Sequence, residues 1–229
     1  LHCHIGSQIF DIEPFEHAAE VMLGFIAEIR EKTGLALEIL DLGGGFGIKY
    51  LPEHDPVQYD RYMMQVSETV KKSCAALGIN TPYIVIEPGR SIVGPAGVTL
   101  YTVGSVKEIP GVRTYVAVDG GMCDNPRYIL YQSEYEAMVA NKASQPRLRT
   151  VTIAGKCCES GDLIGERMPL QEVQAGDIIA VLSTGAYNYS MASNYNRIPK
   201  PAVVMLRDGK DRVVVRRETL DDIIRNDLL

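Results

Sequence analysis

The chain has 229 residues, of which 46% are hydrophobic and 23% are charged, so it can bury the core of one large domain or of two modest ones. Its net charge of -6 and the lack of any run of Lys and Arg argue against nucleic acid as a partner, because basic side chains must neutralise the phosphates. No apolar stretch reaches the roughly 18 residues of a membrane helix, and the five cysteines suggest free thiols, so we expect a cytoplasmic protein.

The chain opens with a predicted strand and a predicted helix. In an extended segment over residues 1–5, the two-residue period of a strand puts His2 and His4 on one face. From residue 12 to residue 32, apolar side chains recur at spacings of three and four, which indicates an amphipathic helix with Asp11 available as its N-cap. A strand followed by such a helix is the repeating unit of α/β proteins.

The next strand, helix and strand follow at short intervals. Residues 37–42 form a mostly apolar strand that leads into a glycine-rich loop at residues 43–47. The helix after it has Asp55 as a cap and Pro56 at its first position, and a further strand is expected at residues 83–87. Parallel strands that alternate with helices and end in polar or glycine-rich loops are typical of a β/α barrel.

Two domains are therefore predicted. Residues 1–97 form part of a β/α barrel, and residues 98–229 form a mainly antiparallel β domain with a short closing helix at residues 220–225. Asp208-Gly209 is the expected turn of a β-hairpin. The strands expected in the second domain are residues 98–106, 114–119, 148–153, 177–182, 202–206 and 212–216.

Several residues near the ends of the barrel strands could bind a ligand. The N–H groups of the glycine loop could bind a phosphate, although a tight turn explains the same glycines equally well. Glu87 and Arg90 could bind one polar ligand, with a surface salt bridge as the alternative. His4 could stack on an aromatic cofactor or lie hydrogen-bonded in the core. We expect no metal, because His2 and His4 lack a third ligand at zinc spacing.

The β domain carries further candidates in two segments. In the turn that contains Cys157, Cys158 and Glu159, acidic neighbours should raise the pKa of a thiol and keep it protonated, which suits an acid better than a nucleophile. A buried structural cysteine is the alternative. A later stretch rich in Tyr and Asn includes Tyr187, and by itself it could be a polar loop and nothing more.

Taken together and in chain order, these motifs resemble the diaminopimelate decarboxylases, a family of fold-type III pyridoxal-phosphate enzymes of lysine biosynthesis. Ornithine and arginine decarboxylases share the glycine loop and Glu-Pro-Gly-Arg, whereas Cys-Glu-Ser-Gly-Asp is similar to the diaminopimelate branch. The resemblance implies an alanine-racemase-like (β/α)8 barrel, of which this chain would hold the second part, followed by a C-terminal β domain. The motifs are His-Cys-His-Ile-Gly-Ser-Gln at 2–8, the glycine loop at 43–47, Glu-Pro-Gly-Arg at 87–90, Cys-Glu-Ser-Gly-Asp at 158–162 and Gly-Ala-Tyr at 185–187.

The resemblance implies a set of cofactor-binding residues. His4 would stack on the ring of pyridoxal 5'-phosphate, and Glu87 would face the pyridine nitrogen and stabilise the protonated ring. The other implied contacts to the cofactor, mainly to its phosphate, are Ser7, Gly44, Gly45, Gly89 and Tyr187.

The resemblance also implies how the substrate, meso-diaminopimelate, is bound and decarboxylated to L-lysine. Cys158 would be the acid that protonates the substrate carbon after carbon dioxide leaves, and Glu159 would bind the distal amine. In the family both residues reach the active site of a partner subunit, which implies a homodimer. Arg90, Arg127 and Tyr131 would bind the distal carboxylate through charge-assisted hydrogen bonds.

One feature of the family has no counterpart in the chain. The Schiff-base lysine of the family lies in a Tyr-Ala-x-Lys-Ala-Asn-like motif, and no lysine here has that context. We therefore expect the C-terminal portion of such an enzyme, inactive by itself because the first half of the barrel is absent. Two alternatives are another basic amino acid decarboxylase of the family, and a non-catalytic remnant that binds a full-length partner.

Overall fold

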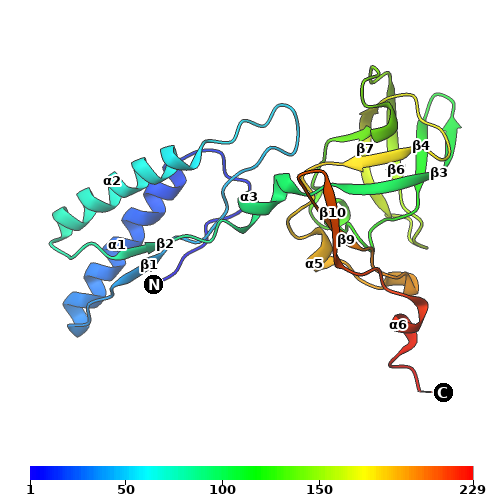
Figure 1. Ribbon diagram of the computed structural model, residues 1–229. Helices are drawn as coiled ribbons and strands as arrows, with labels where there is room; N and C mark the ends of the chain where they lie inside the picture. The colour runs from blue at the N-terminus through cyan, green and yellow to red at the C-terminus, as the bar shows by residue number, and fades with distance from the viewer. Residues whose placement is uncertain (229) are drawn as a thin grey trace. The chain divides into compact units, whose positions relative to one another are not determined.

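The computed structural model describes residues 1–228, which fold as two units, Leu1–Pro95 and Ala96–Leu229 (Figure 1). The boundary expected from the sequence follows residue 97. Within the described part of the chain, none of the helices combines the length and the apolar character that crossing a membrane requires.

The first unit contains a small parallel sheet. Strand β1 (Ile39–Asp41) pairs in parallel with β2 (Tyr83–Val85). Residues 1–3 run parallel along the other edge of β1, where the Cys3 N–H donates to the Asp41 carbonyl over 2.9 Å. The predicted strand at residues 1–5 is thus a shorter extended segment. The three segments lie in the order that consecutive β/α units produce in a parallel sheet.

Two long helices bury the apolar face of this sheet. Helix α1 (Glu13–Thr33) and helix α2 (Tyr59–Leu77) pack against each other and against the sheet. Burial repeats every three or four residues along both helices, as in amphipathic helices. The buried residues of this core are Ile12, Phe15, Ala19, Leu23, Ile26, Leu40, Leu42, Phe46, Tyr62, Val66, Val70 and Cys74.

The predicted helix starts need correction. The N-cap of α1 is Ile12, without a side-chain cap, so Asp11 does not take the role expected for it. Helix α2 begins at Tyr59 after the extended residue Gln58, so Asp55 and Pro56 belong to the preceding loop. Capping preferences are weak compared with the packing of Tyr62 and the residues that follow it in the core, and that packing decides where the ordered helix begins.

The second unit is built on one six-stranded sheet in the order β5-β8-β3-β4-β6-β7. All neighbouring strands are antiparallel except β4 and β6, which are parallel. The outermost strands β5 and β7 also contact each other, so the sheet curls into a nearly closed barrel. Its strands are β3 (Thr99–Ile109), β4 (Arg113–Val118), β5 (Ala137–Val139), β6 (Arg149–Ala154), β7 (Leu163–Leu170) and β8 (Ile178–Val181).

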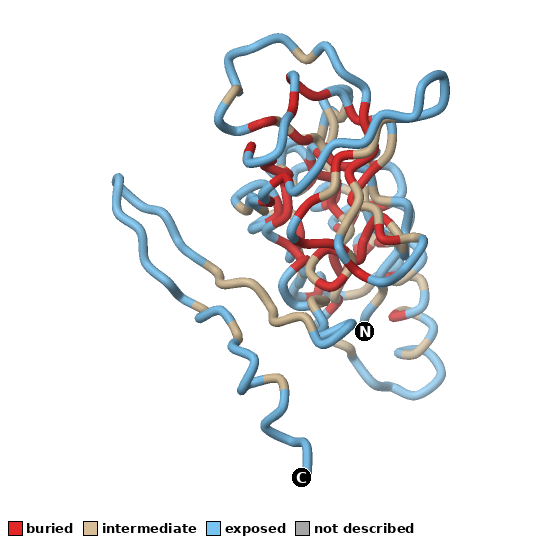
Figure 2. Tube along the Cα trace, turned by 90° about the vertical axis from the view of Figure 1, so that its right-hand side faces the viewer, coloured by how far each residue is buried: buried red, intermediate tan, exposed pale blue. Residues whose placement is uncertain are grey.

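A separate hairpin of β9 (Val203–Arg207) and β10 (Lys210–Val215) follows the sheet, and both strands are almost wholly exposed (Figure 2). Asp208 and Gly209 have φ angles of 51° and 70°, as a two-residue hairpin turn requires, so the predicted hairpin is confirmed. The closing helix α6 (Leu220–Ile224) begins with a capping box, as the spacing of Thr219 and Asp222 in the sequence predicts. The remaining short helices are α3 (Gly89–Val93), α4 (Arg127–Tyr131) and α5 (Asn188–Met191), with 3-10 turns at Gly94–Ala96, Ala140–Lys142 and Tyr195–Arg197.

Candidate active site

The polar residues of the first unit lie where its strands end, and backbone hydrogen bonds join them. The Glu87 N–H, just beyond β2, donates to the carbonyl of Gly43, just beyond β1, over 2.7 Å. The Gly44 N–H donates to His4 Nδ1 over 3.2 Å, which places the proton of a neutral imidazole on Nε2. The structure therefore brings together His4, the glycine loop and Glu87, as predicted from the sequence.

The glycines are required because the loop is pressed against both neighbouring segments. A Cβ at Gly43 would lie 2.5 Å from the Cys3 carbonyl oxygen, and one at Gly44 would lie 2.2 Å from the Glu87 carbonyl oxygen. Gly45, with a φ of 99°, would place a Cβ 2.3 Å from the Gly6 carbonyl oxygen. No side chain fits at these three positions, so the backbone itself lines the rim.

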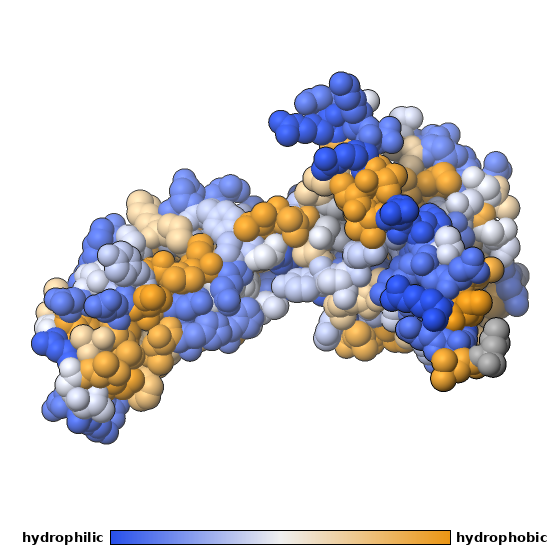
Figure 3. Space-filling view, turned by 60° about the horizontal axis from the view of Figure 1, so that its bottom comes forward, coloured by the Kyte–Doolittle hydropathy of each residue, from blue (hydrophilic) through white to orange (hydrophobic). Residues whose placement is uncertain are grey.

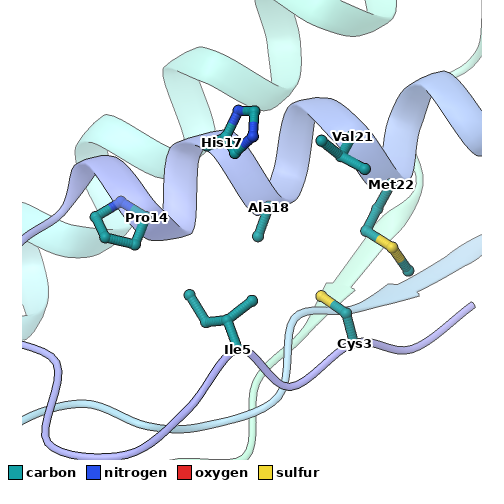
Figure 4. A pocket seen from close by; sticks show the side chains of 7 residues that line it. All are labelled: Cys3, Ile5, Pro14, His17, Ala18, Val21 and Met22. Atoms are coloured by element: carbon teal, nitrogen blue, oxygen red, sulfur yellow. The ribbon is translucent and has the colours of Figure 1, made fainter.

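The two faces of the sheet differ in character. His2, Asp41 and Glu87 point to the face that the helices leave open, and His2 Nε2 lies 3.3 Å from Glu87 Oε2. The opposite face is apolar. There, a hollow of about 400 Å³ lies between α1 and residues 3–5, and apolar side chains make up most of its wall (Figure 4). The residues that line it are Cys3, Ile5, Pro14, His17, Ala18, Val21 and Met22.

Further apolar side chains of this unit are exposed, and Figure 3 shows apolar residues in several patches on its surface. Val21 and Phe25 on α1 are 56% and 49% exposed, and Ile39 and Tyr83 on the sheet are 54% and 77% exposed. Such patches are larger than scattered single residues and are typical of surfaces that another part of a protein covers.

The other predicted residues of this unit differ in their surroundings. Ser7 is exposed, and Gly89, the first residue of α3, donates its N–H to the Glu87 carbonyl over 2.9 Å. Arg90 is buried, and its Nη1 donates to the Tyr50 hydroxyl over 2.6 Å. The Tyr50 ring also lies beneath the guanidinium, 5.7 Å from centroid to Cζ. Tyr50 carried no sequence signal, because it is distant in sequence from the motif that it supports.

The second unit brings together Arg127, Tyr131 and Tyr187. The Arg127 guanidinium is buried and lies 5.6 Å from the Tyr131 ring centroid and 5.4 Å from the Tyr187 ring centroid, in cation–π contact with both. Its Nε donates to the Tyr135 hydroxyl over 2.8 Å, and its Nη2 donates to Ser133 Oγ over 3.2 Å. Among the described residues, no carboxylate forms an ion pair with Arg127.

Tyr187 has a backbone conformation that side chains rarely adopt, with φ 72° and ψ -32° just before α5. Such residues cost roughly 1–3 kcal/mol and persist where the surrounding structure holds them, often at functional sites. Tyr187 is 45% exposed as a residue although its ring contacts Arg127, so part of it is accessible to a ligand.

The turn that carries Cys158 and Glu159 is organised by a residue that we did not single out from the sequence. Asp162 is buried, and its two carboxylate oxygens each accept a backbone N–H over 2.6 Å, one from Met122 and one from Cys157. Cys158 and Glu159 themselves are exposed. Asp162 therefore fixes the backbone from which these two side chains project.

The contacts of this turn extend to a later loop. The Cys158 N–H donates to Asn196 Oδ1 over 2.6 Å, and the Tyr195 hydroxyl donates to Glu159 Oε2 over 3.1 Å. The aromatic and amide-rich stretch noted in the sequence thus supports the turn directly.

The expectation about thiol protonation applies to Cys157, and its main cause differs. Burial raises the pKa of the Cys157 thiol, and the Asp162 carboxylate adds a smaller effect in the same direction. The neighbouring Cys123 is buried as well, which raises its pKa to about 12. Cys157 is a buried structural cysteine, as the alternative interpretation held, whereas Cys158 faces solvent.

Known proteins similar to this chain were found by sequence and by structure. Residues 1–94 match the family described as pyridoxal-dependent decarboxylase, pyridoxal binding domain. The diaminopimelate decarboxylase of Bacillus subtilis is 54% identical over 100% of this chain and 52% of its own length. That of Synechocystis sp. is 45% identical over 100% of this chain and 49% of its own length. The chain thus spans about half the length of the curated relatives it matches.

Solved structures agree with these relatives. A diaminopimelate decarboxylase from M. jannaschii in complex with L-lysine has a TM-score of 0.90 at 34% identity, over 100% of this chain and 51% of the other. A lysine/ornithine decarboxylase of Vibrio vulnificus complexed with cadaverine has a TM-score of 0.73 at 24% identity, over 86% and 51%, and shows likeness of fold alone.

These findings correct one expectation and bear out another. The description as a C-terminal portion is not supported, because residues 1–94 match the pyridoxal-binding domain of the family. The resemblance inferred from the motifs agrees with the relatives that span the whole chain. Residues 1–94 thus match the pyridoxal-binding domain of the pyridoxal-dependent decarboxylases, and the whole chain is similar to about half of a diaminopimelate decarboxylase.

Proposed function

We propose that this chain is part of an enzyme that decarboxylates meso-diaminopimelate to L-lysine with pyridoxal 5'-phosphate. The observation that carries the proposal is the convergence of His4, the glycine loop and Glu87 at the ends of adjacent parallel strands. In β/α barrels the ends of the strands carry the active site. Relatives that are 45–54% identical over the whole chain bear the name of this activity.

The residues of the first unit fit the cofactor. The glycine loop exposes backbone where any side chain would collide with its neighbours, and the Gly45 N–H has no hydrogen-bond partner within the described chain. A phosphate needs such N–H donors, and the exposed Ser7 hydroxyl adds one more. Gly89 fits less well as a donor, because its N–H already binds the Glu87 carbonyl. We therefore assign the phosphate to the glycine loop and Ser7.

Pyridoxal phosphate, when bound, supplies an electron sink for the pair of electrons that carbon dioxide leaves behind. Glu87 would hold the ring nitrogen in its protonated form, because a carboxylate beside it would stabilise the positive charge. The His4 Nδ1 accepts the Gly44 N–H, which fixes the plane of the imidazole that would cover one face of the ring. Glu87, His4 and the glycine loop would together orient the ring against the substrate.

Arg127 is the residue best placed to bind the distal carboxylate of the substrate. Its guanidinium is buried without a carboxylate partner in the described chain, and an unpaired buried charge is costly until an anion joins it. The rings of Tyr131 and Tyr187 both contact the guanidinium and help to hold it in place. Arg90 contributes a second guanidinium, steadied by Tyr50, and Glu159 binds the distal ammonium group of the substrate.

Cys158 donates the proton to the substrate carbon after decarboxylation. Its thiol is exposed on a turn that Asp162 and Asn196 hold rigid, so it is accessible to a ligand. We propose that Cys158 and Glu159 act in the active site of a second copy of the chain, in a homodimer. The Leu1–Pro95 unit is part of an alanine-racemase-like (β/α)8 barrel, and the second unit is the β domain of the same fold.

The test is a decarboxylation assay of the full-length enzyme that contains this chain. Release of carbon dioxide from meso-diaminopimelate should exceed release from ornithine, arginine and lysine. Glu87→Gln should lower kcat about 100-fold, because the ring nitrogen loses the charge that stabilises it. Cys158→Ala should lower kcat with little change in KM, since the thiol acts after the substrate is bound.

Preference for ornithine or arginine would instead favour another basic amino acid decarboxylase. No activity at all, combined with tight binding to a second decarboxylase chain, would favour a non-catalytic remnant. A cytoplasmic location, expected from the free thiols, stays a prediction.

A further inference from the structure

Three side chains of the first unit meet beside the proposed cofactor site. His2, Asp41 and Glu87 come from three neighbouring segments of the parallel sheet, and one ligand atom of each lies within 4.8 Å of the others. The contact between His2 Nε2 and Glu87 Oε2 measures 3.3 Å. No role assigned above uses His2, although it touches the carboxylate that carries the ring-nitrogen assignment.

The backbone sets this contact. His2 is bridged to Asp41, and the Glu87 N–H is bonded to the Gly43 carbonyl, so both residues are held to the same central strand. Side chains two residues apart along a strand share a face, and the register between neighbouring strands aligns these faces across the sheet. His2 and Glu87 therefore both point to the open face. The two side chains meet because of the sheet, and no flexible loop has to bring them together.

We propose that His2 is a positioning residue for Glu87, and this rests on the proposed function. Nε2–H of His2 donates to Oε2 of Glu87 and turns the other oxygen, Oε1, toward the ring nitrogen of the cofactor. A carboxylate has about four lone-pair sites on its two oxygens, so it can serve both donors at once. Without His2 the end of the Glu87 side chain rotates freely, since its last torsion has a broad minimum.

Asp41 supports this arrangement and does not replace His2. Its Oδ1 accepts the Gly43 N–H over 2.8 Å, so the Asp41 side chain is already committed to holding the glycine loop. Asp41 also places a second acidic group near Glu87. The His2 imidazole is the one donor side chain in this cluster of three.

A divalent cation is the rival occupant of the same cluster. One imidazole and two carboxylates are ligands that Zn²⁺ accepts, and a fourth position would be open. The expectation of no metal rested on spacing along the sequence, which does not reveal ligands from separate strands. A bound cation and the positioning role of His2 exclude each other, because the cation would occupy the carboxylate oxygens that the ring nitrogen needs.

The test compares His2→Ala and His2→Gln in the full-length holoenzyme. We expect His2→Ala to lower kcat about 10-fold with little change in KM for the substrate, and to weaken reconstitution with pyridoxal phosphate about 10-fold, as loss of one charge-assisted hydrogen bond predicts. The absorption band of the protonated ring should shrink. His2→Gln places an N–H near the same position and should restore most of these losses.

The Glu87→Gln background separates this inference from the proposed function. Adding His2→Ala to Glu87→Gln should cost nothing further, because His2 acts through Glu87. Additive losses, or a His2→Ala enzyme equal to wild type while Glu87→Gln is impaired, would overturn the inference and leave the proposed function standing. A Glu87→Gln enzyme with the activity of wild type would overturn both the inference about His2 and the proposed function. One equivalent of Zn²⁺ in the purified enzyme, with activity lost on chelation, would also overturn the inference about His2 and would indicate a metal site instead.

Discussion

Asp162 shows how one buried side chain can hold two functional loops. Its carboxylate accepts the N–H groups of Met122 and Cys157, both over 2.6 Å, and glycines on both loops make room for it. A Cβ at Gly121 or Gly155 would lie 2.5 or 2.2 Å from a carboxylate oxygen. The last residue of Cys-Glu-Ser-Gly-Asp is therefore structural, whereas the exposed residues at its start are available for chemistry.

Asp162→Asn should lower the free energy of unfolding by about 2 kcal/mol, because the amide nitrogen would face a backbone N–H and leave that donor unsatisfied. Urea denaturation followed by circular dichroism measures the change. Asp211→Asn, at an exposed position in β10, is the matched control and should be within about 0.5 kcal/mol of wild type. Equal stability of the two variants would show that the carboxylate does not hold the loops.

Asp124 makes stability depend on pH. Burial raises the pKa of its carboxyl group from 3.8 to about 6, although it accepts the Tyr101 hydroxyl over 2.7 Å. Between these two values the folded protein binds more protons than the unfolded protein, so stability falls as pH rises through that window, by up to about 3 kcal/mol.

Asp124→Asn keeps an acceptor for Tyr101 and removes the titration. The free energy of unfolding of both proteins can be measured in urea between pH 4 and pH 7. As pH rises, the value for Asp124→Asn should increase relative to that of wild type, and the difference should become constant above the pKa of about 6. Parallel curves for the two proteins would mean that Asp124 stays charged throughout this range.

At the scale of elements, one glycine within α1 and one at its C-terminal cap have the same free space and differ in backbone conformation. Gly24 lies within the helix and Gly34 caps its C-terminus with φ 73°, and a Cβ at either position would meet nothing within 4 Å. Gly24→Ala should stabilise the protein by up to about 1 kcal/mol through helix propensity. Gly34→Ala should destabilise it by roughly 1 kcal/mol, because alanine resists the left-handed conformation.

Thermal unfolding of the two variants gives the comparison, and each serves as the control for the other. If both changes moved the melting temperature in the same direction, packing around the helix and not backbone conformation would set the outcome.

Elements were predictable where local pattern and tertiary packing agree. The two long helices, the β9–β10 hairpin and the α6 capping box follow from apolar spacing and turn residues. Strand β7 was not predicted, because no alternation of apolar and polar residues survives in a segment that contains Gly165, Glu166, Arg167 and Pro169. Its extended conformation depends instead on hydrogen-bonded pairing with β6. The three-residue β5 has too few residues to show a period.

The residues proposed to act on ligands could be predicted from the sequence, whereas the residues that hold them in place could not. Glycine spacing and the alternation of His2 and His4 indicated the rim, because these depend on neighbours along the chain. Tyr50 under Arg90 and Asp162 under Cys157 depend on contacts between distant segments, which no periodicity records.

At the scale of the whole molecule, the lysine that binds the cofactor covalently is not expected in this chain. Lys32, Lys49, Lys71 and Lys72 of the first unit are all exposed, and Lys32 pairs with Glu28 on the surface of α1. A lysine that bonds stably to a cofactor needs a desolvated setting, which these positions do not offer.

Borohydride reduction of the 229-residue chain with pyridoxal phosphate, followed by peptide mass spectrometry, should therefore give only weak labelling spread over several lysines. The full-length enzyme, treated in the same way, should carry its label outside these residues. One lysine of this chain labelled in full would overturn the expectation.

The contact between the glycine loop and Glu87 limits how the enzyme could be redesigned. A single methyl group on Gly44 would lie 2.2 Å from the Glu87 carbonyl oxygen, and every residue type has this carbonyl, so Gly44 cannot be replaced whatever side chain stands at position 87. Tyr131, whose side chain is largely exposed while its ring contacts Arg127, carries no such restriction. Efforts to alter substrate choice should begin at Tyr131 and leave the rim of the sheet untouched.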